Sequence, residues 1–150
     1  MGRIESSIEI EAPVEKVFTF FADPKSMEKM IPEDAEVKVE MISKGPIGVG
    51  TTWRISGVLG GRKIESESEC VEFEENRRMT TRQTKGDFKR FDGTIVFEAT
   101  EKGTKVTDTM DYELPYSVVG KIMDKLKAGK DLERFAKEGY EKAKQILEEG

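Results

Sequence analysis

The segment "TIVFEATEKGTKVTDTMDYELP", residues 94–115, alternates apolar and polar residues on both sides of Lys102-Gly103. Alternation with a period of two predicts half-buried strands, and a Lys-Gly pair between two such runs predicts a hairpin turn. The spacing then changes, because apolar residues recur at three- and four-residue intervals from Val119 to Leu147. This pattern predicts one long amphipathic helix, which Pro115 can begin. A strand pair followed directly by a long helix constrains how the rest of the chain packs.

The period of two also holds upstream, from Val37 to the end of the quoted segment, and predicts six strands in series. Gly60-Gly61 and Glu75-Asn76 are expected to be hairpin turns. The apolar phase shifts by one residue at Val71, which predicts a bulge or bend near Cys70. Short turns between successive strands indicate an antiparallel meander.

The first 32 residues add one strand and two short helices. Residues 4–10 alternate Ile or Ser with Glu or Ser, and Pro13 then precedes the helical pattern "VEKVFTFF". Asp23 is expected to cap a second short helix, "PKSMEKMI". The sequence therefore predicts an α+β fold: a seven-stranded curved antiparallel sheet wrapped around a long C-terminal helix, in which Gly129 marks a bend.

The composition excludes several classes of partner. The 150 residues are expected to form one domain, residues 1–150, with a net charge of −5 that opposes binding to nucleic acid. No apolar run approaches the ~20 residues of a membrane span, so no stable membrane insertion is expected. The first residues lack the apolar core of a signal peptide, which favours a cytoplasmic location. One Asn and two Gln among 150 residues are typical of thermophilic proteins.

The sequence lacks histidine and contains one cysteine, Cys70. Without histidine, Ser-His-Asp and Cys-His catalysis and histidine-ligated zinc are excluded. We therefore expect no metal and no cofactor, and we expect Cys70 to be a small buried apolar residue.

The glycine-rich stretch "KGPIGVGTTWRISG", Lys44–Gly57, raises the alternative of a nucleotide-binding loop. A phosphate loop leads into a helix and carries a Lys-Ser/Thr pair. Here the glycines lead into the strand pattern "TTWRI", and no lysine follows. The stretch is therefore interpreted as a turn or a gate.

Five segments in this order resemble a known family: "IEIEAPVEKVFTFFADP", "GVGTTWRI", "CVEFEENRRM", the quoted segment 94–115 and the helix beginning "YSVVGKIMDKL". They resemble the START-related helix-grip superfamily (SRPBCC), and most closely its polyketide cyclase/dehydrase and lipid-transport branch. The resemblance extends from Ile4 to about Leu147. It implies a helix-grip fold with an apolar cavity between the sheet and the C-terminal helix, beside which the glycine-rich stretch forms a hairpin lip.

One set of residues would face one another across the sheet and the helix. These candidate ligand-binding residues are Trp53, Ile55, Met79, Phe91, Asp108, Met110, Tyr112, Met123, Leu126 and Phe135. Apolar residues that face one another in this way are also expected in a close-packed core without a cavity. The resemblance to the family favours a cavity.

Asp108 interrupts an apolar face, where a carboxylate is costly unless it is paired. It is either a polar anchor or acid/base group inside the cavity, or a residue that turns to solvent or pairs with Arg54, Arg82 or Arg90. We favour the second interpretation. Asp108 and Tyr112 are the only catalytic candidates.

Three functions remain open. The first is binding or carriage of a small hydrophobic ligand, such as a lipid, polyketide-like or isoprenoid-like molecule. The second is a cyclase or dehydratase that uses the same cavity. The third is a co-chaperone-like module that binds a protein through the outer face of the sheet, which its charged composition disfavours.

Overall fold

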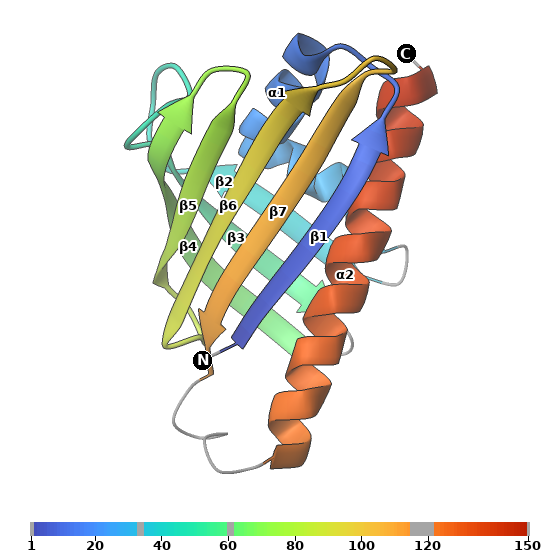
Figure 1. Cartoon of the computed structure of the whole chain (residues 1–150). Coiled ribbons are helices and arrows are strands. Elements are labelled where there is room, and N and C mark those ends of the chain that lie inside the picture. Colours follow the sequence, from blue (N-terminus) through green and yellow to red (C-terminus); the bar gives the residue numbers. More distant parts are fainter. Residues whose placement is uncertain (1, 33–34, 60–61, 115–121, 150) are drawn as a thin grey trace.

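The computed structural model describes residues 2–32, 35–59, 62–114 and 122–149, and within them it shows seven strands and three helical segments (Figure 1). The strands are β1 (Gly2–Ile10), β2 (Glu36–Met41), β3 (Thr52–Leu59), β4 (Arg62–Glu74), β5 (Arg78–Lys85), β6 (Arg90–Ala99) and β7 (Thr104–Glu113). The helices are α1 (Val14–Ala22), the 3-10 helix η1 (Pro24–Lys29) and α2 (Ile122–Glu149).

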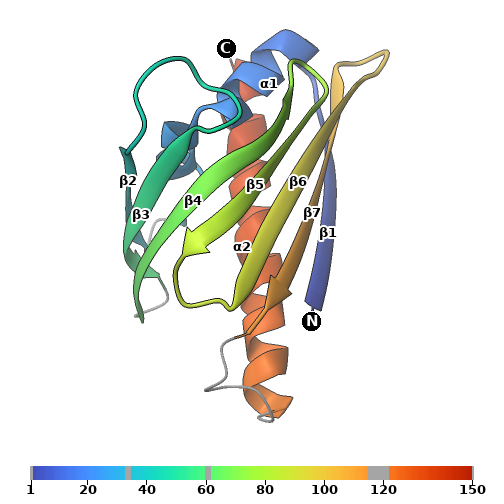
Figure 2. The ribbon, with the colours of Figure 1, turned by 90° about the vertical axis from the view of Figure 1, so that its left-hand side faces the viewer.

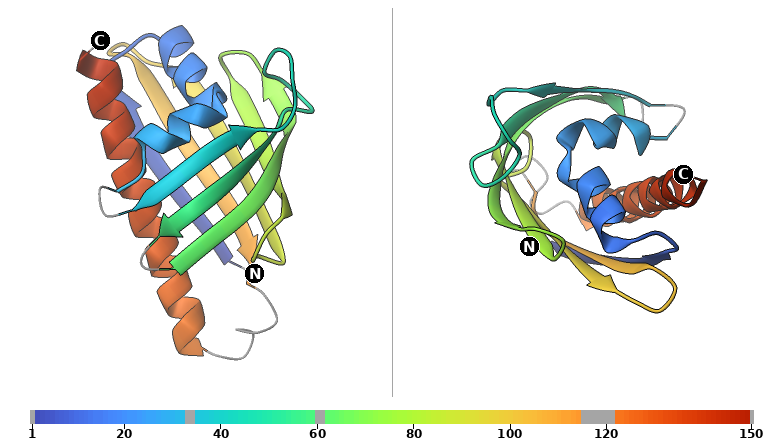
Figure 3. Two further views of the ribbon diagram at one scale, coloured as in Figure 1. Left: turned by 180° about the vertical axis from the view of Figure 1, so that it is seen from behind. Right: turned by 90° about the horizontal axis from the view of Figure 1, so that it is seen from above.

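The strands form one antiparallel sheet in the order β1-β7-β6-β5-β4-β3-β2. Strands β2 to β7 are a meander, and β1 pairs with β7, so α1 and η1 carry the chain from one edge of the sheet to the other. The sheet curves strongly, and α1, η1 and α2 lie on its concave side (Figures 2 and 3). The predicted helix-grip fold is confirmed.

Most of the predicted elements have the expected places. The second short segment is a 3-10 helix, and the Asp23 side chain caps it by accepting a hydrogen bond from the Lys25 backbone N–H. The expected turn at Gly60-Gly61 and the expected helix start at Pro115 lie outside the described residues. No helix in the described ranges is long and apolar enough to span a membrane.

The predicted bulge lies in β4. The β4–β5 register shifts between Cys70 and Glu72, and again between Glu67 and Ser68. A bulge bends its strand. The long strand β4 bends here with the curvature of the sheet, and the Cys70 side chain is buried.

Aromatic side chains close one end of the curved sheet. Phe18 of α1 makes edge-to-face contacts with Phe73 of β4 and Phe97 of β6, with ring centroids 5.3 and 5.0 Å apart. Val17 beside it is fully buried. Helix α1 therefore covers this end of the sheet. The apolar face predicted for "VEKVFTFF" makes its contacts with the strands.

Two glycines permit close approaches of the backbone. Gly57 of β3 has a φ of +152°, and a Cβ there would lie 1.9 Å from the Glu36 carbonyl oxygen of β2. A Cβ at Gly129 would lie 3.0 Å from the Tyr112 hydroxyl. Gly129, which the sequence singled out as a bend, thus lets α2 pass close to β7.

Candidate ligand-binding site

A cavity of about 220 Å³ lies between the concave face of the sheet and the helices. Its walls are the segment from the end of α1 through η1, the loop between β2 and β3, strands β3 to β7, and Tyr140 of α2. Thr81, Gly93 and Met110 face it from neighbouring positions on β5, β6 and β7. At Gly93 a Cβ would meet only the Thr81 hydroxyl, at 3.6 Å, so the absent side chain there leaves space in the cavity.

The structure brings together five of the predicted ligand-binding residues. These wall residues are Trp53, Met79, Phe91, Asp108 and Met110. They come from four different strands, and the curvature of the sheet turns them toward one space.

The other predicted residues lie elsewhere. Ile55 packs beside the cluster of Val39, Trp53 and Cys70. Tyr112 is buried with its ring 6.1 Å from that of Phe88, and Phe135 is half-buried on α2; none of these three lines the cavity. The side chains of Met123 and Leu126 lie outside the described part of the structure.

Asp108 and Tyr140 form a buried polar pair in the cavity wall. The Tyr140 hydroxyl donates a hydrogen bond of 2.5 Å to Asp108 Oδ2, and Tyr140 and Asp108 are 7% and 8% exposed. Burial raises the pKa of the Asp108 carboxyl from its ordinary 3.8 to about 6, and the hydrogen bond from Tyr140 opposes that rise. Burial also raises the pKa of Tyr140, and the neighbouring carboxylate adds to the effect. The pair therefore places a carboxyl with a raised pKa, about 6, beside an apolar space.

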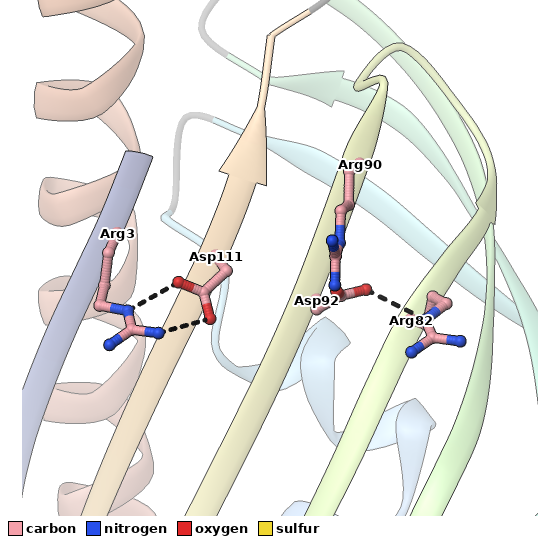
Figure 4. A network of polar contacts seen from close by, with 5 residues as sticks. All are labelled: Arg3, Arg82, Arg90, Asp92 and Asp111. Atoms are coloured by element: carbon pink, nitrogen blue, oxygen red, sulfur yellow. Dashed lines mark hydrogen bonds and ion pairs between the residues drawn. The ribbon is translucent and has the colours of Figure 1, made fainter. Parts of the chain in front are cut away.

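The favoured interpretation of Asp108, solvent exposure or pairing with an arginine, is wrong. Arg82 and Arg90 both pair with Asp92, at 3.3 and 2.7 Å, on the outer face of the sheet (Figure 4). Arg54 pairs with Glu67. The regular β6–β7 register keeps Asp108 opposite Ile95 on the inner face of the sheet. There the Tyr140 hydroxyl donates a hydrogen bond to its carboxylate.

Trp53, another wall residue, carries a buried polar group. Its side chain is 5% exposed, and its indole Nε1–H has no hydrogen-bond partner. Cys70, on the neighbouring strand β4, donates a weak hydrogen bond from its thiol to the Glu72 carbonyl, and burial raises its pKa. Cys70 is thus a poor nucleophile at neutral pH, as expected from the sequence.

A family model described as "polyketide cyclase / dehydrase and lipid transport" matches residues 1–148, almost the whole chain. The chain belongs to this family. The resemblance found in the sequence is thereby confirmed. A comparison with curated proteins finds no sequence match.

Several solved structures share the fold of this polyketide cyclase/dehydrase family member. TTHA0849 from Thermus thermophilus is 24% identical, with a TM-score of 0.82 and 97% of each chain covered. The Zhui aromatase/cyclase from a Streptomyces species is 16% identical, with a TM-score of 0.77 and coverage of 98% of this chain and 93% of that chain. The di-domain aromatase/cyclase StfQ of the steffimycin pathway is 15% identical, with a TM-score of 0.79. The match covers 98% of this chain and 51% of the StfQ chain.

The predicted set lacked the wall residues of the helices and loops and several on the strands, such as Thr81, Gly93 and Ile95. Phe21, Met27, Met30, Ile47 and Tyr140 line the cavity without having been predicted to do so. Ile47 belongs to the glycine-rich stretch, which does lie beside the cavity as a lip. The charged groups among the described wall residues are Asp23 and Asp108, and no lysine or arginine is among them.

Proposed function

We propose that the protein binds a small apolar molecule in the cavity between the sheet, η1 and α2, and carries or senses it. The observation that supports this proposal is a cavity of about 220 Å³ in which nine of the 19 described wall residues are Met, Phe, Ile or Trp. Interiors are normally close-packed, so an apolar space of this size is unusual in a core. Methionines such as Met79 and Met110 adapt to guests of different shape.

The volume indicates the size of the guest. An engineered apolar cavity of about 150 Å³ holds benzene, and pockets for drug-sized ligands begin at about 300 Å³. The cavity lies between these values and suits one or two rings, or an aliphatic chain of equal volume. Burial of the guest's apolar surface would supply the affinity, at about 25 cal/mol per Å² before the cost of association.

Native mass spectrometry of the freshly purified protein tests this proposal, with Gly93→Val as the blocking variant. A valine at this strand position would project its methyl groups into the cavity and suits β-structure, so the variant should fold. Thr94→Val is the matched control, because Thr94 faces the opposite side of the sheet and contacts Thr80 there.

We expect a reproducible added mass, or uptake of added 2-acetonaphthone, in the wild type and in Thr94→Val, and its loss in Gly93→Val. Equal uptake by all three proteins would place the guest outside the cavity. A wild type that holds neither a co-purified molecule nor the added ketone would contradict the proposal.

A second candidate function is proton transfer on the bound molecule, as in a cyclase or dehydratase. The observation that favours it is Asp108, a buried carboxyl with a pKa of about 6 in the cavity wall. A general base with a pKa near the working pH is well suited to remove a proton next to a carbonyl. Histidine, the commonest group for this task, is absent from the sequence.

Deuterium exchange into the methyl group of 2-acetonaphthone in D₂O, followed by NMR, separates the two functions. An enzyme would accelerate the exchange, and Asp108→Asn would abolish the acceleration without loss of binding. A carrier would leave the exchange at the rate of the buffer.

A further inference from the structure

One carboxylate oxygen in the wall of the cavity lacks a hydrogen-bond partner. Asp108 Oδ2 accepts the hydrogen bond of the Tyr140 hydroxyl, whereas Asp108 Oδ1 accepts none within the described part of the chain. Asp108 lies opposite Ser6 of β1 and Ile95 of β6, and neither side chain donates to it. A buried carboxylate is stabilised by hydrogen bonds to its charged form. Oδ1 is therefore an acceptor whose donor is missing.

Asp108 Oδ1 is accessible from the cavity. Among the described residues, Nε1 of Trp53 is the one side-chain nitrogen or oxygen atom that is both fully buried and without a partner. Asp108 Oδ1 has no partner either, so it retains accessible surface. The Asp108 side chain lines the cavity from the inner face of the sheet, as Met110 does two positions farther along β7. A guest in the cavity can therefore reach this oxygen.

The charges of the wall favour an uncharged guest. The ionisable side chains among the described wall residues are Asp23, Cys70, Asp108 and Tyr140, and none of them is cationic. A guest with a carboxylate or phosphate group would meet a carboxyl group without a counter-charge, which is costly in a poorly solvated space.

The single free acceptor atom indicates the kind of polar group on the guest. An ammonium group would bring three N–H donors to Asp108 Oδ1, and each buried donor that stays unpaired costs free energy. A carbonyl group offers only an acceptor, so it leaves Oδ1 without a donor. A hydroxyl group brings one donor to one acceptor.

We propose that the ligand is an uncharged apolar molecule of one or two rings, or of equal volume, whose hydroxyl group donates a hydrogen bond to Asp108 Oδ1. This inference rests on the proposed function, since it requires a guest in the cavity. It identifies Asp108 as a specificity-determining residue that selects alcohols and phenols over ketones, carboxylates and amines.

Water in the empty cavity does not change this preference. A water molecule that donates to Asp108 Oδ1 would be displaced by the guest, and a guest with a hydroxyl group restores that hydrogen bond. A ketone of the same shape would displace the water without replacing its donor. The pKa of Asp108 is about 6, so the carboxyl is ionised at pH 8 and the difference between the two guests is largest there.

The test compares three probes at pH 8 by isothermal titration calorimetry: 1-(2-naphthyl)ethanol, the corresponding ketone 2-acetonaphthone, and the corresponding cationic amine 1-(2-naphthyl)ethylamine. We expect the alcohol to bind at least about ten-fold more tightly than the ketone, which corresponds to one hydrogen bond to a charged group. We expect the amine to bind more weakly than the alcohol.

The Asp108→Asn variant keeps the shape of the side chain and removes its charge. Its amide can turn an N–H toward the guest, so the alcohol-to-ketone affinity ratio should fall from about ten to about one or below. Asp111→Asn is the matched control. Asp111 lies on the same strand and pairs with Arg3 (Figure 4), and it is not among the wall residues, so this variant should leave the ratio near ten.

A measurement on the wild type alone does not depend on the folding of a variant. The NMR signal of the Asp108 carboxyl carbon reports the pKa of this group. The pKa should fall when the alcohol binds, because the hydroxyl stabilises the ionised form, and it should rise when the ketone binds.

Three results would overturn the inference while cavity binding stands. They are equal affinities of the alcohol and the ketone for the wild type, tighter binding of the amine than of the alcohol, and a preference for the alcohol that persists in Asp108→Asn. Binding of none of the three probes would overturn both the inference and the proposed function.

Discussion

The Tyr140 hydroxyl lies 2.5 Å from Asp108 Oδ2 and joins the C-terminal helix to strand β7. The two residues are 32 positions apart in the sequence, and both line the cavity. The hydrogen bond anchors α2 over the sheet beside the space where a guest would lie. It also sets the protonation of the buried carboxyl, since the donor stabilises the charged form that burial disfavours.

The first prediction concerns the pH dependence of stability. The pKa of Asp108 is about 6 in the folded protein and near 3.8 in the unfolded chain, so between these values the folded state holds the extra proton. Asp108 therefore destabilises the fold increasingly as the pH rises from about 4 to about 6, by on the order of 3 kcal/mol in total. The measurement is urea unfolding of the wild type and of Asp108→Asn across this pH range. As the pH rises from about 4 to about 6, the free energy of unfolding of the wild type should fall relative to that of Asp108→Asn by on the order of 3 kcal/mol.

Asp111 on the same strand is the control for that experiment. Its carboxylate accepts a hydrogen bond from Arg3 (Figure 4), which lowers the pKa of Asp111. The carboxylate of Asp111 therefore stabilises the fold at neutral pH, and this stabilisation is lost on acidification. The free energy of unfolding of the wild type should rise with pH relative to that of Asp111→Asn, which is the opposite of the dependence expected for Asp108→Asn. A wild-type minus Asp108→Asn difference that stays flat from pH 4 to 7 would mean that Asp108 is not buried as described.

The second prediction concerns Tyr140→Phe. The variant keeps the ring, which packs 5.4 Å from that of Phe21, and removes the donor to Asp108. At pH 8 the carboxylate loses its partner, which should cost about 1.5–3 kcal/mol. At pH 5 the carboxyl is largely protonated and the cost should be smaller.

A double-mutant cycle isolates this hydrogen bond. In the Asp108→Asn background, the cost of Tyr140→Phe at pH 8 should fall, because the charge that the hydroxyl stabilises is gone. An equal cost in both backgrounds would show that the hydroxyl does not act on Asp108.

The third prediction concerns the close approach of β2 and β3. In Gly57→Ala the new Cβ would collide with the Glu36 carbonyl, at a φ that L-residues rarely adopt. We expect a loss of at least about 2 kcal/mol in the free energy of unfolding. Gly48→Ala is the control: it has nothing within 4 Å of its Cβ, and its stability should change by less than about 0.5 kcal/mol. Equal stability of both variants would contradict the described pairing of β2 with β3.

The fold could be predicted because its signals are local. Alternation in β6 and β7, the phase shift at Cys70 and the three-to-four spacing of α2 each follow from which side of an element faces the core. The position of the cavity along the strands is not local. Ile55 and Tyr112 share the inner face with Trp53 and Met110 but lie farther along their strands, and a period of two does not distinguish them.

The environment of Asp108 was missed for a related reason. Its partner Tyr140 belongs to a helix whose registry against the sheet depends on the whole packing, including Gly129 beside Tyr112. The arginines that could have paired with Asp108 instead reach other carboxylates: Arg82, directly opposite Asp92 across β5 and β6, and Arg90 both pair with Asp92, and Arg54 pairs with Glu67. The sequence named the residue that interrupts the apolar face but did not identify its partner.

Intermolecular NOEs between 2-acetonaphthone and the methionine methyl groups test most directly whether a guest enters the cavity. Met79 and Met110 line it, whereas Met41 is 39% exposed at the β2 edge and serves as the internal reference. We predict NOEs from the ring protons to the methyl groups of Met79 and Met110 and none to Met41. NOEs confined to Met41, or none to any of the three, would contradict the account.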